Sequence, residues 1–428
     1  MAGDWRDATL DQLGRIVTGK TPPSSCPDYF GGEIPFVTPT DFDGRRIIST
    51  SGRYLTEQGA GSVSGSRIPA RSVMVSCIGS DMGKAAVAGR DCVTNQQINS
   101  IVVEFGDDPL FVYYSLSTRK AEIRTAAGGS AQPILNKSAF GRLDISLPPP
   151  DEQRVIAHIL GTLDDKIELI RRMNKTLEAM ARALFQSWFV DFDPVCAKAE
   201  GRDPGLPRPL ADLFPDSFED SELGEIPRGW EVGILSDCSS LNSETWSKET
   251  RPTVINYVDL SNTKWGRIEA VTTYAQHDAP SRAQRVLRSR DTIIGTVRPG
   301  NGSYAFISEG ELTGSTGFAV LRPLRAEYAE FVYLAATAAE NIEALAHLAD
   351  GGAYPAVRPE VVAATQVIKP GYGVLQSFSL AIGPLLAKMA ANDRESRILA
   401  ALRDTLLPKL ISGELRVDVA DRLVKEIV

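Results

Sequence analysis

The amino-acid sequence contains the same set of motifs twice, in the same order. A W-x-x-x-x-L spacing begins at Trp5 and recurs at Trp230. Residues 68–78 (IPARSVMVSCI) match residues 287–297 (LRSRDTIIGTV) at a shift of 219 residues. A unit of that size is a duplicated domain, because solenoid repeats have periods of about 20–50 residues. Two similar but non-identical domains on one chain favour a protein that recognises two related targets.

Length and composition are those of a soluble multidomain protein. A chain of 428 residues suffices for two or three domains, and 43% hydrophobic with 23% charged residues is ordinary for globular proteins. The N-terminal residues lack the pattern of a secretory signal, and no run of 18 apolar residues predicts a membrane span. Five cysteines without a C-x-x-C pair favour reduced thiols, so we expect a cytoplasmic protein.

Two mixed domains are predicted, at residues 1–150 and 230–373. Short β-rich runs in both are separated by Gly, Pro, Asp and Ser clusters. One helix is predicted in each domain, over about 109–126 and 328–348. Residues 191–229 are rich in Pro, Gly and Asp, which is typical of a linker. The predicted fold class is α+β, with two similar mixed α/β domains separated by two long helices.

The two long helices are predicted at residues 151–190 (a central spacer helix) and 374–412 (a C-terminal spacer helix), with 413–428 as a tail. Apolar residues recur every seven positions in both, which is the seam of a coiled coil. The seam residues are Ile156, Leu163, Ile170, Leu177 and Leu184 in the first helix, and Phe378, Leu385, Asn392, Leu399 and Leu406 in the second.

An apolar stripe on a helix has to be buried against something. We expect the two helices to form an antiparallel coiled coil with pseudo-two-fold symmetry; the alternative is that each packs only on its own domain. Asn174 and Asn392 lie near the helix middles, where a polar contact can fix the register. Ser396 and Arg403 interrupt the second seam and leave its packing open.

Motifs for catalysis are missing. The sequence has no phosphate-binding G-x-x-x-x-G-K-[ST] loop, no G-x-G-x-x-G after a strand, no G-x-S-x-G and no H-E-x-x-H. Three scattered histidines give little material for a metal site. The acid pair Asp41/Asp43 is interpreted as a turn and Asp164/Asp165 as a solvated helix face. We predict no catalytic residues and no metal ligands. A binding or scaffold role is therefore the favoured class of function.

Several motifs resemble those of the DNA-specificity (S) subunit of type I restriction–modification systems. They are, in chain order, YFGGEIP at 29–35, TNQQ at 94–97, LPPPDEQ at 147–153, SWFVDFDP at 187–194, GEIPRGW at 224–230 and LLPKLISGEL at 406–415. Each is weak alone, but their order around two heptad helices is specific, and the resemblance covers essentially the whole chain.

The resemblance implies a division of labour. Each mixed domain would be a target-recognition domain that reads one half of a split, asymmetric site on double-stranded DNA. The helices would set the distance between the halves and dock two modification (methyltransferase) subunits, which carry S-adenosylmethionine. A restriction (translocase–nuclease) subunit would join this assembly. The chain itself would hold no cofactor and perform no catalysis.

Candidate DNA contacts are polar residues in the duplicated loops, because base edges are read by donors and acceptors such as Arg, Asn and Gln. In the first half they are Lys20, Thr21, Ser80, Lys84, Asn95, Gln96, Gln97, Ser130 and Gln132; in the second they are Arg298, Asn301, Ser303, Ser315, Thr316, Tyr354 and Arg358. At each single position, a turn-forming or solvated role is the competing interpretation.

The charge distribution limits how the chain would hold DNA. Its net charge is −8, which disfavours binding through charge alone. Residues 281–300 nevertheless carry five arginines against Asp291, a patch that either contacts phosphates or is simply solvated. Gly314–Gly317 stands where Asn95–Ile98 stands at the same shift of 219, so we expect the two half-sites to differ in sequence.

Two other classes of protein compete with this interpretation. A coiled-coil scaffold would organise a protein assembly without reading bases, and retained affinity for DNA of any sequence would favour it. A stand-alone methyltransferase is disfavoured by the missing cofactor motifs and by the lack of a Pro-Pro-aromatic strand end.

Replacing Arg298 tests the strongest candidate, because it follows a buried-type strand and precedes Pro299-Gly300. We expect Arg298→Ala to weaken specific DNA binding by about 1–3 kcal/mol. Titration of the cognate duplex measures this effect, and an unchanged affinity would reject the assignment.

Overall fold

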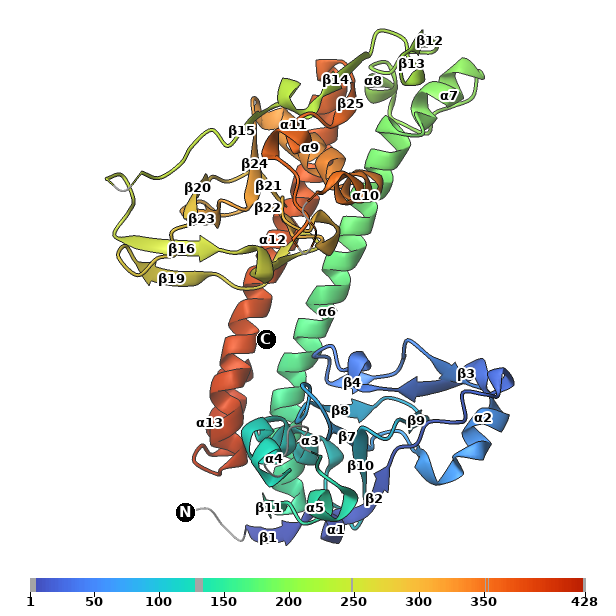
Figure 1. Cartoon of the computed structure of the whole chain (residues 1–428), viewed down its shortest axis with the longest axis vertical. Helices are drawn as coiled ribbons and strands as arrows, with labels where there is room; N and C mark the ends of the chain where they lie inside the picture. Colours follow the sequence, from blue (N-terminus) through green and yellow to red (C-terminus); the bar gives the residue numbers. More distant parts are fainter. Residues whose placement is uncertain (1–4, 128–133, 248, 351, 353, 426–428) are drawn as a thin grey trace. The chain divides into compact units, whose positions relative to one another are not determined.

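The computed structural model describes residues 5–127, 134–247, 249–350, 352 and 354–425 (Figure 1). The chain divides into two compact units. The first comprises residues 1–172 with 393–428, and the second comprises residues 173–392. Each unit therefore contains one mixed domain and one half of each long helix.

The first domain is built on three sheets. β1 (Arg6–Thr9) pairs antiparallel with β11 (Asp144–Leu147). A five-stranded sheet has the order β2 (Gly14–Thr18), β10 (Ile98–Val103), β7 (Val73–Ser76), β8 (Ala85–Ala88) and β4 (Ile47–Ile48). A four-stranded sheet has the order β5 (Tyr54–Leu55), β3 (Phe30–Val37), β9 (Cys92–Thr94) and β6 (Arg67–Ile68).

The second domain repeats this arrangement. β14 (Glu231–Ile234) pairs with β25 (Gln366–Lys369). One four-stranded sheet has the order β15 (Ser239–Leu241), β24 (Phe318–Pro323), β21 (Thr292–Gly295) and β22 (Tyr304–Phe306). The other has the order β19 (Thr272–Ala275), β16 (Val254–Val258), β23 (Leu312–Ser315) and β20 (Ala283–Leu287), and a short hairpin joins β17 (Thr263–Lys264) to β18 (Arg267–Ile268).

Strand pairing confirms the duplication. β3 runs parallel to β9 in the first domain, and β16 runs parallel to β23 in the second. Backbone conformation also repeats, since Arg71 (φ 68°) and Arg290 (φ 76°) are both left-handed at matched positions of the repeated motif. The repeat is therefore one of three-dimensional structure as well as of sequence.

Short helices cover the sheets: α1 (Leu10–Leu13), α2 (Glu57–Ser62), α3 (Pro109–Ser117), α4 (Lys120–Ala126) and α5 (Lys137–Gly141) in the first domain, and α9 (Ala329–Ala336), α10 (Ala339–Leu348) and α11 (Pro359–Ala363) in the second. The single helices predicted at 109–126 and 328–348 are each wrong, because each is two helices. At both breaks a threonine hydroxyl donates to a backbone carbonyl of the preceding turn: Thr118 to Ser115 and Thr337 to Tyr333. The backbone leaves the helical conformation at the next residue, Arg119 (ψ 25°) or Ala338 (ψ 144°).

The long helices are α6 (Pro150–Phe189) and α12 (Tyr372–Ile411). Proline suits the first position of α6, where the missing N–H costs nothing. Gln153 in the first turn is fully buried and fixes this end to the domain. Its Nε2 donates to Pro148 O (2.9 Å) and to Asp107 Oδ1 (2.9 Å), and its Oε1 accepts from Asp108 N (2.8 Å).

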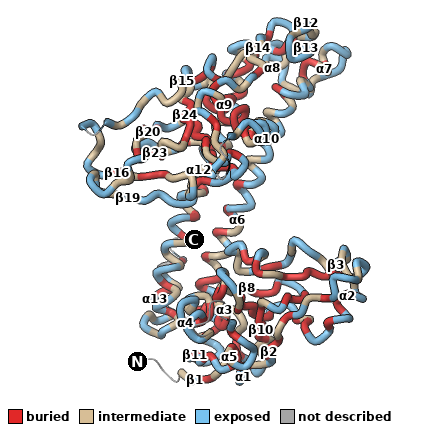
Figure 2. The backbone as a smooth tube through the Cα atoms, viewed as in Figure 1, coloured by how far each residue is buried: buried red, intermediate tan, exposed pale blue. Residues whose placement is uncertain are grey.

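Both helices bury their apolar seams within each unit (Figure 2). In the first unit, Ile156 and Leu163 of α6 share one core with Leu399 and Leu406 of α12 and with the domain's own strands. In the second unit, the Trp188 and Phe378 rings lie 5.7 Å apart in an aromatic cluster. Within each unit, the helices therefore pair antiparallel and also pack on the domain. The two arrangements that the sequence left open, pairing of the helices and packing on the domains, are both present.

The remaining seam residues follow the same division. Ile170 is buried in the first unit's core, whereas Leu177, Leu184 and Leu385 are only half-buried in the second unit. Here Ala181 and Ile382, four positions after Leu177 and Phe378, and Leu386, next to Leu385, are the buried ones. The predicted row is thus less completely buried in the second unit than in the first.

The predicted asparagine contact is confirmed. Asn392 Nδ2 donates to Asn174 Oδ1 (2.7 Å), and Asn174 Nδ2 donates to Met389 O (3.2 Å). Both side chains are buried within the second unit. A buried amide is costly unless it is paired, so a shifted register that separates the two would be penalised.

Arg403 completes the seam that it was expected to interrupt. Its Nη1 donates to Asp164 Oδ1 (2.8 Å), and Asp164 also accepts from Tyr114 OH (2.7 Å). The prediction that Asp164 lies on a solvated helix face is wrong, since its side chain is only 12% exposed. Burial and the adjacent carboxylate Asp164 raise the pKa of Tyr114, so its hydroxyl stays protonated and donates.

The segments expected to be a linker and a tail contain regular structure. Residues 191–229 include α7 (Asp193–Ala199), α8 (Arg208–Ala211) and the hairpin of β12 (Phe218–Ser221) with β13 (Gly224–Pro227). Phe214 anchors this segment, because its ring lies 5.1 Å from that of Trp188. In the tail, α13 (Val417–Lys425) buries Ala420 and Val424 in the first unit's core. Buried apolar side chains thus order both segments.

Helix α12 is long and apolar enough to cross a membrane by length and composition alone. Its apolar side chains Phe378, Ile382 and Leu386 are instead packed in the core of the second unit.

Removing one asparagine of the buried pair should destabilise the second unit. Asn174→Leu leaves the Asn392 amide without its acceptor, at a cost of about 1–3 kcal/mol. The double variant Asn174→Leu/Asn392→Leu replaces both amides by apolar groups and should recover most of this loss. Thermal unfolding of the full chain measures both. A double variant no more stable than the single one would contradict the pairing.

Candidate nucleic-acid interface

A groove of about 980 Å³ opens in the second domain where three loops meet. The loops follow β16, connect β21 to β22, and connect β23 to β24. Its lining residues are Asp259, Leu260, Ser261, Lys264, Trp265, Arg282, Thr296, Val297, Arg298, Gly300, Asn301, Ser303, Ser315, Thr316, Gly317 and Tyr354. Of the seven second-half candidates, all but Arg358 line this groove.

Backbone hydrogen bonds hold the loops together. Thr296 N donates to Gly317 O (2.8 Å), and Arg298 N donates to Pro355 O (2.8 Å). The turn after β21 reverses tightly, with left-handed backbone at Arg298 (φ 48°) and Gly302 (φ 66°). A side chain on Gly302 would collide with the Trp265 ring, so glycine is required there.

The groove has a buried floor and an exposed rim. Ser303 Oγ on the floor donates to Leu260 O (3.1 Å), and Ser315 Oγ accepts from Gly317 N (3.2 Å). Both serines are buried and shape the loops. The rim side chains are exposed to solvent: Ser261, Lys264, Trp265, Arg282, Arg298, Asn301 and Tyr354. These exposed groups are the ones placed to meet a ligand.

One carboxylate stands among the basic groups of the groove. Asp259 accepts from Tyr257 OH (2.7 Å) and Ser261 Oγ (3.0 Å), and it lies 3.8 Å from Arg282. Burial raises its pKa, but these hydrogen bonds and Arg282 outweigh that and lower the pKa of Asp259. The carboxylate is therefore ionised at neutral pH and presents acceptors beside the donors of Lys264, Arg282 and Arg298.

Arg298 is held in an unusual conformation. Its backbone is left-handed, which costs a non-glycine residue roughly 1–2 kcal/mol. Its guanidinium carbon lies 4.9 Å from the centre of the Tyr354 ring. Such cation–π stacking orients the plane of the guanidinium.

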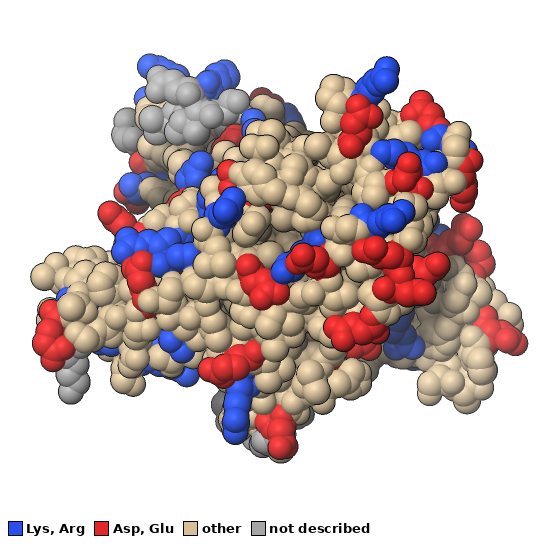
Figure 3. Space-filling model, turned by 90° about the horizontal axis from the view of Figure 1, so that it is seen from above, with Lys and Arg blue, Asp and Glu red and all other residues tan. Residues whose placement is uncertain are grey.

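Some arginines of the basic patch at 281–300 form ion pairs within the domain, and others line the groove. Arg288 and Arg290 are engaged within the domain, Arg288 with Glu244 (2.8 Å) and Arg290 with the buried Glu330 (2.8 Å). Arg282 and Arg298 line the groove instead. On the molecular face shown in Figure 3, Lys and Arg side chains are interspersed with Asp and Glu. The patch is thus neither wholly solvated nor wholly available to phosphates.

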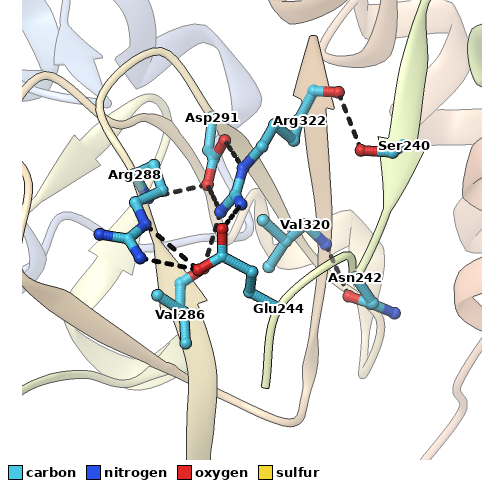
Figure 4. A network of polar contacts seen from close by, with 8 residues as sticks. All are labelled: Ser240, Asn242, Glu244, Val286, Arg288, Asp291, Val320 and Arg322. Carbon is cyan, nitrogen blue, oxygen red and sulfur yellow. Dashed lines mark hydrogen bonds and ion pairs between the residues drawn. The ribbon is translucent and has the colours of Figure 1, made fainter. Parts of the chain in front are cut away.

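An ion network around the buried carboxylate of Asp291 links strands of the second domain (Figure 4). Arg322 on β24 donates through Nε and Nη2 to Asp291 (both 2.9 Å), whose side chain is fully buried. Arg322 also pairs with Glu244, which in turn binds Arg288. The hydrogen bond from Arg288 leads the causes that lower the pKa of Glu244. The network joins the two four-stranded sheets of the second domain.

The first domain gathers its candidates at one edge of the five-stranded sheet. Register places the end of β2, the start of β10 and the end of β7 side by side, through Thr18↔Asn99 and Ile98↔Ser76. The loops from these strand ends carry Lys20, Thr21, Ser80, Lys84, Asn95, Gln96 and Gln97. Ser130 and Gln132 lie outside the described residues.

Several of these side chains bind one another. Thr21 Oγ1 donates to Gln96 Oε1 (2.6 Å), and Asn95 Nδ2 donates to Gln97 Oε1 (3.0 Å). Asn95 is buried and shapes the turn, whereas Gln96 and Lys20 are exposed. Lys84 pairs with Asp81 (2.9 Å), and Ser80 is exposed. Their contacts with DNA stay predictions.

The correspondence between the two β-turns differs by one residue from the sequence-based alignment. Ile98↔Ser76 in the first domain matches Phe318↔Gly295 in the second, which is a shift of 220 for this strand. Asn95 therefore corresponds to Ser315. The side chains of both accept a hydrogen bond from the backbone N–H two residues later. In both domains, the carbonyl of that later residue accepts from the backbone N–H that directly follows β7 or β21. The alignment of Gly314 with Asn95 was wrong because the second domain has one more residue here. Thr94 lies seven residues after Val87, whereas the equivalent Gly314 lies eight residues after Phe306.

The chain is similar to type I restriction proteins in three comparisons. Residues 2–179 match the family model described as the type I restriction modification DNA specificity domain. The MjaIX specificity subunit of Methanocaldococcus jannaschii is 26% identical over 426 residues, covering 97% of this chain and 94% of its own length. The HindI specificity subunit of Haemophilus influenzae is 25% identical over 393 residues, covering 79% of this chain and 83% of its own length.

Over nearly its whole length the chain is similar to specificity subunits of type I restriction–modification systems, and residues 2–179 carry the match to the family model. The fold agrees, since the S subunit from M. genitalium superposes with a TM-score of 0.60 at 16% identity, covering 95% of this chain and 96% of that one. The matching relatives are specificity subunits, which have a non-catalytic role in type I restriction–modification systems. Among the described residues, no group of His, Cys, Asp and Glu side chains has the arrangement of a metal site.

Six polar or aromatic groove residues of the second domain were not among the sequence candidates: Asp259, Ser261, Lys264, Trp265, Arg282 and Thr296. Of these, only Arg282 had been noted, as part of the basic patch at 281–300. The first four follow β16, and the parallel pairing of β16 with β23 brings them to the groove. The signal was the match of Val37-Thr-Pro-Thr40 to Val258-Asp-Leu-Ser261, each leading from a strand into a 3₁₀ turn. Arg358 is exposed at the start of α11 and does not line the groove.

Breaking the network around Asp291 should destabilise the second domain. Arg322→Met leaves the buried Asp291 carboxylate without its guanidinium, at a cost of about 3–5 kcal/mol. Asp291→Asn combined with Arg322→Met removes the uncompensated charge and should recover much of the loss.

Thermal unfolding of the full chain measures these differences. Arg228→Met, at an exposed position outside the network, is the matched control and should shift stability by less than about 0.5 kcal/mol. A single Arg322→Met variant as stable as this control would contradict the role assigned to the ion pair.

Proposed function

We propose that the chain reads a bipartite, asymmetric DNA site and docks two methyltransferase subunits and a restriction subunit, without catalysis of its own. The observation that carries the proposal is that two topologically equivalent sets of loops present different side chains. The first offers Gln96, Lys20 and Ser80, and the second offers Arg298, Asn301 and Thr316. Equivalent loops with different donors and acceptors suit two different half-sites.

The long helices support the spacing part of the proposal. A helix of 40 residues is about 60 Å long, and two sites on one face of B-DNA lie about 34–36 Å apart per helical turn. We infer that the helix pair, in which Asn174 and Asn392 bind each other within the second unit, acts as a spacer between readers. Its length exceeds one turn of DNA.

Charge supports a role within a larger assembly. The net charge of −8 makes tight binding of DNA phosphates by the isolated chain unfavourable. We therefore expect the methyltransferase subunits to supply most phosphate contacts and the S-adenosylmethionine. In this arrangement the complex works in the cytoplasm, where the five free cysteines stay reduced.

A coiled-coil scaffold that does not read bases is the competing function. It would use the same helix pair, but it gives no reason for an ionised carboxylate and three basic side chains to converge in the groove of the second domain. A specific reader does need such a mixture, because base edges present both donors and acceptors.

Comparing the DNA methylation pattern of the host with and without this gene tests the proposal. We expect deletion to abolish methylation at one bipartite motif with two unlike halves, and re-expression of the chain to restore it. As a control, methylation at unrelated motifs should be unaffected. Unchanged methylation at every bipartite motif, or loss of a continuous motif, would overturn the proposal.

A further inference from the structure

We propose that Arg298 reads a guanine in the half-site of the second target-recognition domain, through the O6 and N7 acceptors of the major-groove edge. The inference rests on the proposed function and assigns one base to one side chain. It also predicts that the first domain lacks this contact.

The comparison of the two turns singles out this position. Arg298 stands where the first domain has Gly79, at the shift of 219 that also relates Gly83 to Gly302. All four residues have positive φ: 86° at Gly79, 48° at Arg298, 87° at Gly83 and 66° at Gly302. The turn geometry therefore favours glycine at this point in both domains. An arginine here bears a backbone penalty that glycine avoids, which points to a use for its side chain.

The surroundings hold the backbone and the guanidinium in place. Arg298 N donates to Pro355 O, and Pro299 follows with its restricted φ. The stack on Tyr354 orients the guanidinium plane. A planar fork held in one orientation matches the paired acceptors of guanine, and this is the commonest specific contact between proteins and base edges.

Neighbouring groups favour base reading over a phosphate contact. Arg298 shares the groove with Asp259 and Asn301, which offer acceptors as well as donors. An ionised carboxylate such as Asp259 would repel a phosphate, whereas it can accept from an amino group of a base. Lys264 and Arg282 on the same rim supply positive charge that needs no fixed plane.

The test uses the complex of the full chain with its methyltransferase subunits and duplexes carrying the methylated motif. Each guanine in the motif is replaced in turn by 7-deazaguanine, which lacks N7, or by inosine, which keeps O6 and N7. We expect one guanine at which 7-deazaguanine weakens wild-type binding roughly 10- to 100-fold, whereas inosine changes it little.

Arg298→Gly restores the residue of the first domain and should fold at least as stably as the wild type, which thermal unfolding checks. This variant should bind the unmodified site roughly 10- to 100-fold more weakly and lose its sensitivity to 7-deazaguanine at that one position. Arg298→Lys should keep the salt dependence of binding but lose most of the same sensitivity. Lys264→Ala, the matched control, should weaken all sequences alike and leave the 7-deazaguanine effect intact.

Three results would overturn the inference. The Arg298→Gly complex could keep the wild-type sensitivity at every guanine, or it could lose affinity equally for all sequences, as for a phosphate contact. The third is a half-site of the second domain that contains no guanine on either strand. Failure of the proposed function is distinct, because the wild-type complex would then bind all duplexes alike before any variant is tested.

Discussion

Burial of the apolar faces of α6 and α12 is the constraint on which the rest of the structure depends. Each helix has to cover its stripe, and within each unit it does so against both the other helix and a sheet domain. Ile156 and Leu163 share a core with Leu399, while Trp188 and Phe378 share an aromatic cluster with Phe214. Because the same side chains serve helix pairing and domain packing, the spacer and the domains are stabilised together.

Polar groups inside this apolar pairing carry its specificity. Leucine against leucine tolerates several registers, whereas the Asn174–Asn392 hydrogen bond and the Arg403–Asp164 ion pair are satisfied only when particular positions face each other. The same division appears in the second domain, where Arg322 pairs with the buried Asp291 in its own sheet and donates to Val286 O on β20 of the other sheet. Apolar burial supplies the stability, and a few paired polar groups select one arrangement.

Sequence reasoning succeeded where a repeated spacing recorded a repeated contact. The heptad rows located α6 and α12 to within two residues at each end, and their central polar positions predicted the asparagine contact. The duplication marked the loops that hold Arg298, Asn301 and Thr316, because matching segments on either side fixed where those loops lie.

It failed where the deciding contact joins residues far apart in the chain. Asp164 looked solvated because its partners Tyr114 and Arg403 lie 50 and 239 residues away. Asp259 and Trp265 reach the groove because β16 pairs with β23. Local sequence patterns do not predict which distant strands pair. The breaks after α3 and α9 occur at Arg119 and Ala338, two residue types that often continue a helix, so the apolar spacing on both sides hid them.

The first unit is assembled from both ends of the chain, and this affects the order of events during synthesis. Residues 393–425 fill the core beside Ile156 and Ile170, with Leu410 and Ala420 fully buried there. A ribosome releases the N-terminal domain long before those residues exist, although domains generally fold as they emerge. Part of the apolar surface of the N-terminal domain therefore stays uncovered until α12 and α13 leave the exit tunnel. This domain is synthesised first, but its core is completed only after the second domain has been made.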